Sequence, residues 1–145
     1  MNEMELKFIS RSENEIFARN AVAAFILPLN PSLSELSDVK TAVSEAVTNA
    51  IVHGYGGKEG WITLRCTTKG NSLHIEISDS GKGIDDVEKA QQPFFTTASE
   101  EERSGMGFTI MQTFMTEFSL QSQKGVGTTV TMDKDFNAKA GSDAR

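Results

Sequence analysis

The chain has 145 residues, a formal net charge of −6 and a single cysteine, Cys66. Its length corresponds to one domain, and an acidic chain without a basic run is repelled by nucleic acid over most of its surface. One cysteine excludes an internal disulfide and a cysteine zinc cluster, and no apolar stretch approaches the ~20 residues that cross a bilayer. We expect a soluble, cytoplasmic domain over residues 1–133 with a flexible tail over residues 134–145, no membrane segment and no direct nucleic-acid contact.

Alternation of apolar and polar residues predicts five strands along the chain. The pattern is clearest over residues 72–78, where three aliphatic side chains would face one side and polar side chains the other. The five predicted strands cover residues 4–10, 61–67, 72–78, 118–123 and 128–132.

Helical spacing of apolar residues predicts a first helix directly after the first strand. Ser12 and Glu15 have the spacing of a capping box, so Ser12 is the expected N-cap. Pro28 ends this helix, because proline cannot continue a helix interior. A second helix is expected to begin at Ser32 or Ser34.

The second helix should stop at Gly54, where a glycine run begins. A long polar loop is expected over residues 91–107, followed by a third helix over residues 108–118. The strands outnumber those that short crossovers could make parallel. The sequence therefore predicts an α/β two-layer sandwich: a mixed, mostly antiparallel sheet with helices on one face.

Three polar residues of the second helix stand four positions apart: Glu45, Asn49 and His53. Each step of four residues advances by only about 40° around a helix, so all three line one side. A carboxylate and an amide one turn apart can serve as a base and a magnesium ligand. The alternative interpretation is an ordinary solvated polar face.

Asp79 directly follows an apolar strand and opens the segment Asp79-Ser80-Gly81-Lys82-Gly83. Its carboxylate can accept a hydrogen bond from an exocyclic amine. Gly81 and Gly83 allow a ligand or a backbone to come close. The alternative is a plain turn, for which Asp-Ser-Gly is a common sequence.

Glycines also mark two later segments. Ser104-Gly105-Met106-Gly107 is expected to open the third helix, where free backbone N–H groups could face an anion. Arg103 beside it could meet a terminal phosphate, although a flexible helix start and a surface arginine explain the same residues. Gly125-Val126-Gly127-Thr128 links the last two strands and fits a plain hairpin turn equally well.

The order and spacing of these four segments resemble the nucleotide boxes of the gyrase/Hsp90/histidine-kinase/MutL ATPase superfamily, which has the Bergerat-type ATP-binding fold. The segments Ser44–Ile51 and Arg103–Met111 further resemble the bacterial anti-sigma factor serine kinases, those of sporulation in particular. The likeness extends from about Met4 to Met132.

The resemblance implies that Glu45 is the general base for an attacking hydroxyl and that Asn49 binds the Mg²⁺ that bridges the phosphates of ATP. It implies that Asp79 hydrogen-bonds the adenine amino group, while Gly81 and Gly83 let the nucleotide lie close to the backbone. The role of His53 stays open: packing or capping of the helix is the alternative to a role in the nucleotide box.

The resemblance further implies a lid over the ATP phosphates, formed by residues 91–107. Arg103 would lie near the γ-phosphate, and Thr128 would support the adenine site. The lid residues expected to contact the nucleotide are Thr97, Ser104, Gly105, Met106 and Gly107.

The partners implied by the resemblance are a sigma factor of the sigma F type and an anti-sigma factor antagonist that is phosphorylated on serine. The kinase is expected to sequester the sigma factor as a homodimer with nucleotide bound. The exposed side of the first helix, with Glu13, Arg19 and Asn20, is the candidate partner surface, and Arg19 is its leading residue. Alternatives are a nucleotide-gated binding module, a stress-response-type kinase, and a sandwich domain with decayed boxes.

Overall fold

The computed structural model describes residues 1–91 and 99–136, with the side chains of Lys89 and of residues 99–106 left out. In chain order the elements are β1 (Asn2–Ile9), α1 (Ser12–Phe25), the 3₁₀ turn η1 (Leu27–Leu29), α2 (Leu33–Asn49), the π-helical turn η2 (Ala50–Gly54), β2 (Trp61–Lys69), β3 (Ser72–Asp79), α3 (Val87–Ala90), α4 (Ser99–Phe114), β4 (Glu117–Gln123) and β5 (Gly127–Asp135).

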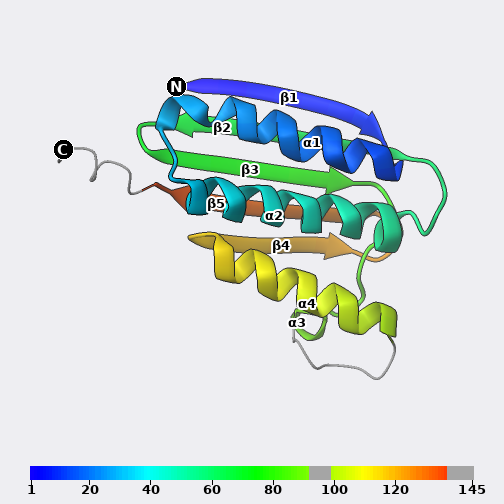
Figure 1. Cartoon of the computed structure of the whole chain (residues 1–145). Coiled ribbons are helices and arrows are strands. Elements are labelled where there is room, and N and C mark those ends of the chain that lie inside the picture. Colours follow the sequence, from blue (N-terminus) through cyan, green and yellow to red (C-terminus); the bar gives the residue numbers. More distant parts are fainter. Residues whose placement is uncertain (92–98, 137–145) are drawn as a thin grey trace.

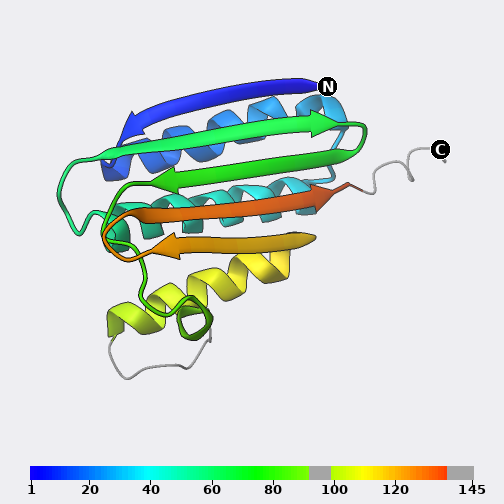
Figure 2. The ribbon, with the colours of Figure 1, turned by 180° about the vertical axis from the view of Figure 1, so that it is seen from behind.

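The strands form one five-stranded sheet in the order β1-β2-β3-β5-β4. Every neighbouring pair in this sheet is antiparallel. The long helices lie on one face of the sheet (Figure 1), and the view from behind shows the other face uncovered (Figure 2). The predicted two-layer sandwich with a mostly antiparallel sheet is confirmed.

The core lies between the sheet and α2. On β3, Leu73, Ile75 and Ile77 point into it, as their alternation predicts. The central helix α2 faces them with small and branched side chains that are almost completely buried: Val39, Ala42, Val43, Ala46 and Val47. Burying one side chain of valine or isoleucine size stabilises the fold by about 1.5–3 kcal/mol. The core therefore holds α2 firmly against the sheet.

Helix α2 begins as the capping box requires. Ser32 is the N-cap: its hydroxyl accepts from the Glu35 N–H at 3.0 Å, and Glu35 Oε1 accepts from the Ser32 N–H at 2.9 Å. For α1 the corresponding prediction is wrong. Its N-cap is Arg11, which has no side-chain capping bond, and Ser12 is already helical. The side chain of Asn14 instead donates to the Ile9 carbonyl at 2.8 Å, which fixes how the chain enters the helix.

Helix α4 differs most from expectation, since it begins at Ser99 and ends at Phe114. The prediction of a loop over residues 91–107 rested on the polarity of this segment and placed the two glycines just before the helix. A mid-helix glycine costs only about 1 kcal/mol, whereas a run of three glutamates at the start of a helix favours it. Phe118, expected both at the end of this helix and at the start of the next strand, lies in β4.

The last strand also extends beyond its expected end at Met132. β5 runs to Asp135, and Phe136 is buried in the core. The Lys134 ammonium donates to the Phe114 carbonyl at 2.7 Å, which ties β5 to the end of α4. Residues 137–145, which hold most of the expected tail, lie outside the described residues.

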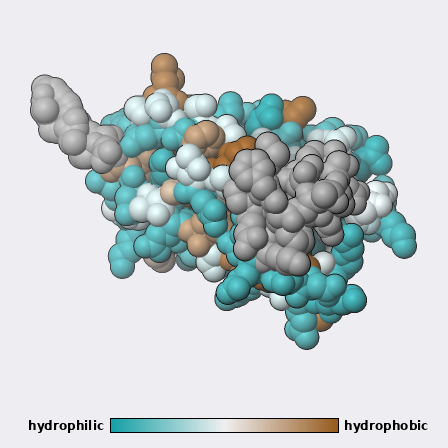
Figure 3. All heavy atoms as spheres, turned by 90° about the horizontal axis from the view of Figure 1, so that it is seen from below, coloured by the Kyte–Doolittle hydropathy of each residue, from teal (hydrophilic) through white to brown (hydrophobic). Residues whose placement is uncertain are grey.

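The face of the molecule seen from below is largely polar (Figure 3). In the view from below, hydrophilic residues dominate around isolated hydrophobic ones (Figure 3). Among the described helices, none has both the length and the apolar character that a bilayer crossing requires.

His74 and two carboxylate side chains form a polar group on the uncovered face of the sheet. His74 Nδ1 lies 2.7 Å from Asp133 Oδ1 on β5, and His74 Nε2 lies 3.3 Å from Glu76 Oε2. The hydrogen bond to Asp133 raises the pKa of His74, against the opposing effect of partial burial, and Glu76 adds to the increase. The protonated imidazole is thus favoured in the folded state.

We expect the pair of His74 and Asp133 to stabilise the fold at mildly acidic pH. A raised folded pKa means that the contribution is fully present below the unfolded value of about 6.5 and is lost as pH rises through the folded pKa. Asp133→Asn should therefore lower the free energy of unfolding at pH 6 by up to about 1 kcal/mol, as for an exposed ion pair, and by less at pH 8.5. Urea unfolding at both pH values measures this. An equal loss at both would contradict the assignment.

Candidate functional site

Glu45 and Asn49 lie one turn apart on α2, on the side that faces α4. A Cβ atom added to Gly107 of α4 would lie 3.0 Å from Glu45 Oε1 and 3.2 Å from Asn49 Nδ2. Helix α4 therefore passes closely over both side chains, and the missing side chain at Gly107 permits this approach. His53 lies further along, in η2, and is partly buried.

The carboxyl group of Glu45 is partly buried. Burial raises its pKa, and the negative charge of Glu15 on α1 raises it further. A carboxylate that holds a proton more tightly than usual is a stronger base, which suits the removal of a proton from a hydroxyl group. The contribution of Glu15 could not be predicted from local sequence patterns, because Glu15 belongs to a different helix.

Asn49 carries a buried amide nitrogen, Nδ2, that has no hydrogen-bond partner among the described residues. Rotation of the amide group by 180° would place its oxygen at the same position. An uncompensated polar atom in a buried position is costly unless a ligand satisfies it. Because Mg²⁺ prefers oxygen ligands, Asn49 fits the expected magnesium ligand.

Within the described residues, no group of three or more histidine, cysteine, aspartate or glutamate side chains could hold a metal ion. At this site Asn49 would supply one oxygen ligand to a magnesium ion, and the phosphates of a bound nucleotide would supply others.

Asp79 lies at the end of β3, where residues 79–83 form a segment called here the Asp79 loop. Its Oδ1 accepts from the Gly81 N–H at 2.8 Å. Burial raises the pKa of Asp79, while the backbone N–H groups of Gly81 and Thr128 act in the opposite direction. The carboxylate is thus held in a fixed orientation in a partly dry environment, where a hydrogen bond from a ligand amine gains in strength.

Gly54 joins the end of η2 to the segment that follows Asp79. The Gly54 carbonyl accepts from the Lys82 N–H at 2.8 Å. A Cβ atom on Gly54 would lie 2.9 Å from Asp79 Oδ1, and one on Gly81 would lie 2.1 Å from the Gly54 oxygen. The helix with Glu45 and the loop with Asp79 are therefore packed backbone to backbone.

Two further glycines hold this loop against the β4–β5 hairpin. Gly83 has φ +75°, and a Cβ there would lie 2.1 Å from the Gln123 carbonyl oxygen. A Cβ atom added to Gly127, at the start of β5, would lie 2.1 Å from the backbone carbonyl oxygen of Asp79. Thr128 pairs with Asp79 in the sheet, and its hydroxyl lies 2.8 Å from the Ser122 hydroxyl. Asp79, Gly81, Gly83 and Thr128 thus lie together.

The expected phosphate-binding residues are only partly described. Gly105 and Gly107 lie inside α4 and not before its first turn, so the prediction that they open a helix is wrong. Arg103, Ser104 and Met106 lie within the bounds of α4, but their side chains are outside the described part. Thr97 lies outside the described residues altogether.

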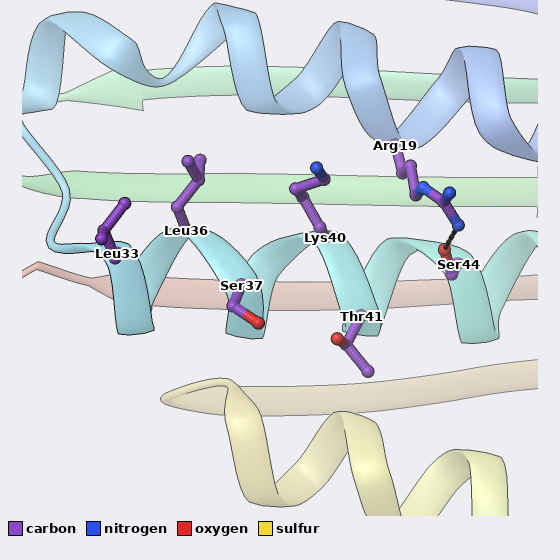
Figure 4. Close-up of a pocket in the computed structure, with 7 residues that line it drawn as sticks. All are labelled: Arg19, Leu33, Leu36, Ser37, Lys40, Thr41 and Ser44. Carbon is purple, nitrogen blue, oxygen red and sulfur yellow. Dashed lines mark hydrogen bonds between the residues drawn. The ribbon is translucent and has the colours of Figure 1, made fainter.

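Arg19 is not the solvated arginine that an exposed helix face would carry. Its guanidinium contacts Glu15 Oε2 at 3.1 Å and the Ser44 hydroxyl of α2 at 3.3 Å, and the Ser44 hydroxyl also bonds Glu15. Arg19 lies at one end of a groove between α1 and α2, with Lys40 further along it (Figure 4). The groove is lined by Arg19, Leu33, Leu36, Ser37, Lys40, Thr41 and Ser44. It is open and separate from the Asp79 loop.

Comparison with known proteins gives the class of the domain. The sequence model of the family described as "Histidine kinase-like ATPase domain" matches residues 11–134. The RsbU and RsbW domains of a Mycobacterium tuberculosis protein share the fold, with a TM-score of 0.68 and 16% identity over 94% of this chain and 33% of that one. The catalytic domain of the histidine kinase ThkA gives a TM-score of 0.55 at 16% identity, over 94% of this chain and 97% of that one.

Close sequence relatives define the family more narrowly. The anti-sigma F factor of Thermoanaerobacter sp. (strain X514) is 59% identical over 133 residues, which covers 92% of this chain and 93% of that protein. The anti-sigma F factor of Clostridium kluyveri (strain ATCC 8527) is 52% identical over 137 residues, 94% of this chain and 96% of that protein. The chain belongs to the anti-sigma F factor family of histidine kinase-like ATPase domains.

The packing of Gly81 on Gly54 can be tested by stability. Gly81→Ala adds a Cβ that overlaps a backbone carbonyl, so we expect a loss of about 1–3 kcal/mol in the free energy of unfolding. Denaturant unfolding measures it, with Ser80→Ala, at the exposed neighbouring position, as the control. If both variants were as stable as the wild type, the two backbones could not be in the described contact.

Proposed function

We propose that this protein is an ATP-dependent protein-serine kinase and an anti-sigma factor that acts in the cytoplasm. Its partners would be a sigma factor of the sigma F type, which it binds and inhibits, and an anti-sigma factor antagonist, which it phosphorylates on serine. The names of its relatives support the partners. The ATPase-domain family supports the use of ATP.

One observation carries the enzymatic part of the proposal. The partly buried Glu45 carboxyl and the unsatisfied amide of Asn49 lie side by side under Gly107, on the helix whose end packs on the Asp79 loop. From Glu45 to Gly54 the chain advances by roughly two and a half helical turns. A nucleotide lying along this path would have its adenine at Asp79 and its phosphates near Asn49.

In the proposed reaction the serine hydroxyl oxygen of the antagonist attacks the γ-phosphorus of ATP. The bond from the γ-phosphorus to the β,γ-bridging oxygen breaks, so that ADP leaves and a phosphoserine forms. Glu45 accepts the hydroxyl proton, and its raised pKa makes it a better acceptor than an exposed glutamate. Asn49 would hold Mg²⁺, which supplies positive charge against the phosphates. Arg103 and the residues Thr97, Ser104, Gly105, Met106 and Gly107 remain proposed phosphate contacts.

We also propose that Arg19 contacts a protein partner and that the kinase acts as a homodimer. Arg19 has 35% of its side chain exposed and is fixed by Glu15 and Ser44, so it is presented to a partner with little entropy left to lose. Lys40 lines the same groove and adds positive charge. The groove therefore suits an acidic side chain of the partner.

We expect Glu45→Gln to lower phosphotransfer by about 10²–10⁴-fold, because the amide cannot accept the proton. ADP affinity should stay within about twofold of wild type, since the base does not contact the nucleotide. Asp79→Asn is the contrasting variant and should weaken ADP binding about tenfold or more. Label transfer from γ-labelled Mg-ATP to the antagonist, with calorimetry for ADP, measures both.

Normal transfer by Glu45→Gln would contradict its role as the base. If the wild type instead bound ATP and captured the sigma factor without transfer to any protein, the nucleotide-gated binding module would replace the kinase.

We expect Arg19→Ala to weaken sigma factor binding by about tenfold or more while ADP affinity is unchanged, because the groove is separate from the Asp79 loop. Arg65→Ala is the matched control: it removes an arginine from the uncovered sheet face, where Arg65 forms an ion pair with Glu5 at 3.6 Å. Surface plasmon resonance with immobilised sigma factor makes the measurement. An equal effect of both variants would exclude Arg19 as a specific contact.

A further inference from the structure

Tyr55 connects two segments that the nucleotide site brings together. It directly follows η2, and its N–H donates to the Ala50 carbonyl at 3.0 Å. Its hydroxyl donates to the Trp61 carbonyl at 2.5 Å and accepts from the Ser80 N–H at 2.8 Å. Through its hydroxyl group, Tyr55 thus joins the end of η2 to the start of β2 and to Ser80, the residue after Asp79.

The position of the Tyr55 ring is set by its contact with the segment before β2. A Cβ atom on Gly60 would lie 2.2 Å from a ring carbon, so the ring lies directly on the Gly60 backbone. That backbone is itself anchored: Ser10, a buried polar residue, accepts from the Gly60 N–H at 3.0 Å and donates to the Lys58 carbonyl at 3.0 Å. The Tyr55 hydroxyl is therefore held in place beside the Asp79 loop.

We propose that Tyr55 is a positioning residue for adenine recognition. It holds the Ser80 amide and thereby orients the Asp79 carboxylate toward the exocyclic amino group of the base. This inference rests on the proposed nucleotide site. It assigns no contact between Tyr55 and the nucleotide; Tyr55 acts through the backbone that carries Asp79.

The geometry distinguishes positioning from general support of the fold. Asp79 gains from adenine a hydrogen bond that hypoxanthine cannot donate, because hypoxanthine carries an oxygen in place of the amino group. A residue that orients Asp79 affects ADP binding and leaves IDP binding almost unchanged. A residue that merely supports the loop weakens the binding of both nucleotides to the same degree.

Tyr55→Phe is the first test, because phenylalanine keeps the ring on Gly60 and removes only the hydroxyl. Calorimetry with Mg-ADP and Mg-IDP should show ADP affinity reduced about three- to tenfold, as for loss of one hydrogen bond. IDP affinity should change by less than about twofold. Ser72→Ala is the control, since it removes a hydroxyl that bonds Asp135 at 2.7 Å at the opposite end of β3. It should leave both affinities unchanged.

Gly60→Ala is the second test and keeps the hydroxyl. The added Cβ would displace the ring, so the ratio of ADP to IDP affinity should fall in this variant too. An unchanged ratio in both folded variants would overturn the role of Tyr55. A wild type that prefers neither nucleotide, or binds neither, would instead refute the proposed adenine site itself.

Discussion

The burial of α2 against the sheet is the constraint on which the rest of the structure depends. One side of this helix consists of small and branched side chains with almost no exposed surface, so its rotation and position are fixed by the core. The polar residues Glu45 and Asn49 must then lie on the flank that α4 covers. Their partial burial follows from the core and leaves Asn49 Nδ2 without a partner among the described residues.

Close backbone packing extends this rigid position to the Asp79 loop. Contacts that only glycine permits join Gly54 to Gly81, and Gly127 to Asp79. The end of η2, the segment after β3 and the β4–β5 hairpin therefore meet around the Asp79 side chain, with backbone packed on backbone at Gly81 and Gly127. Helix α4 approaches the same helix through Gly107, so a ligand at Asn49 would act directly on the position of α4.

Much of the fold follows from local sequence patterns. Alternation along residues 72–78 and the start of the second helix at Ser32 have causes within a few residues, and both are confirmed. The start of α4 could not be predicted in this way, because its packing on α2 compensates for the cost of glycine within a helix. The contact between Gly54 and Gly81 joins segments that are distant in sequence, and so does the hydrogen bond from Arg19 to Ser44. The roles of the site residues remain predictions.

An NMR titration of the whole protein with Mg-ADP tests most directly whether α2, η2 and the Asp79 loop form one adenine-nucleotide site. The account predicts that the largest amide shift changes occur at Gly54, Gly81 and Thr128, and that they continue along α2 to Asn49. His74, on the uncovered face of the sheet, should not change. Saturable changes confined to the groove around Ser37 and Lys40, with none at Gly54 and Gly81, would contradict it.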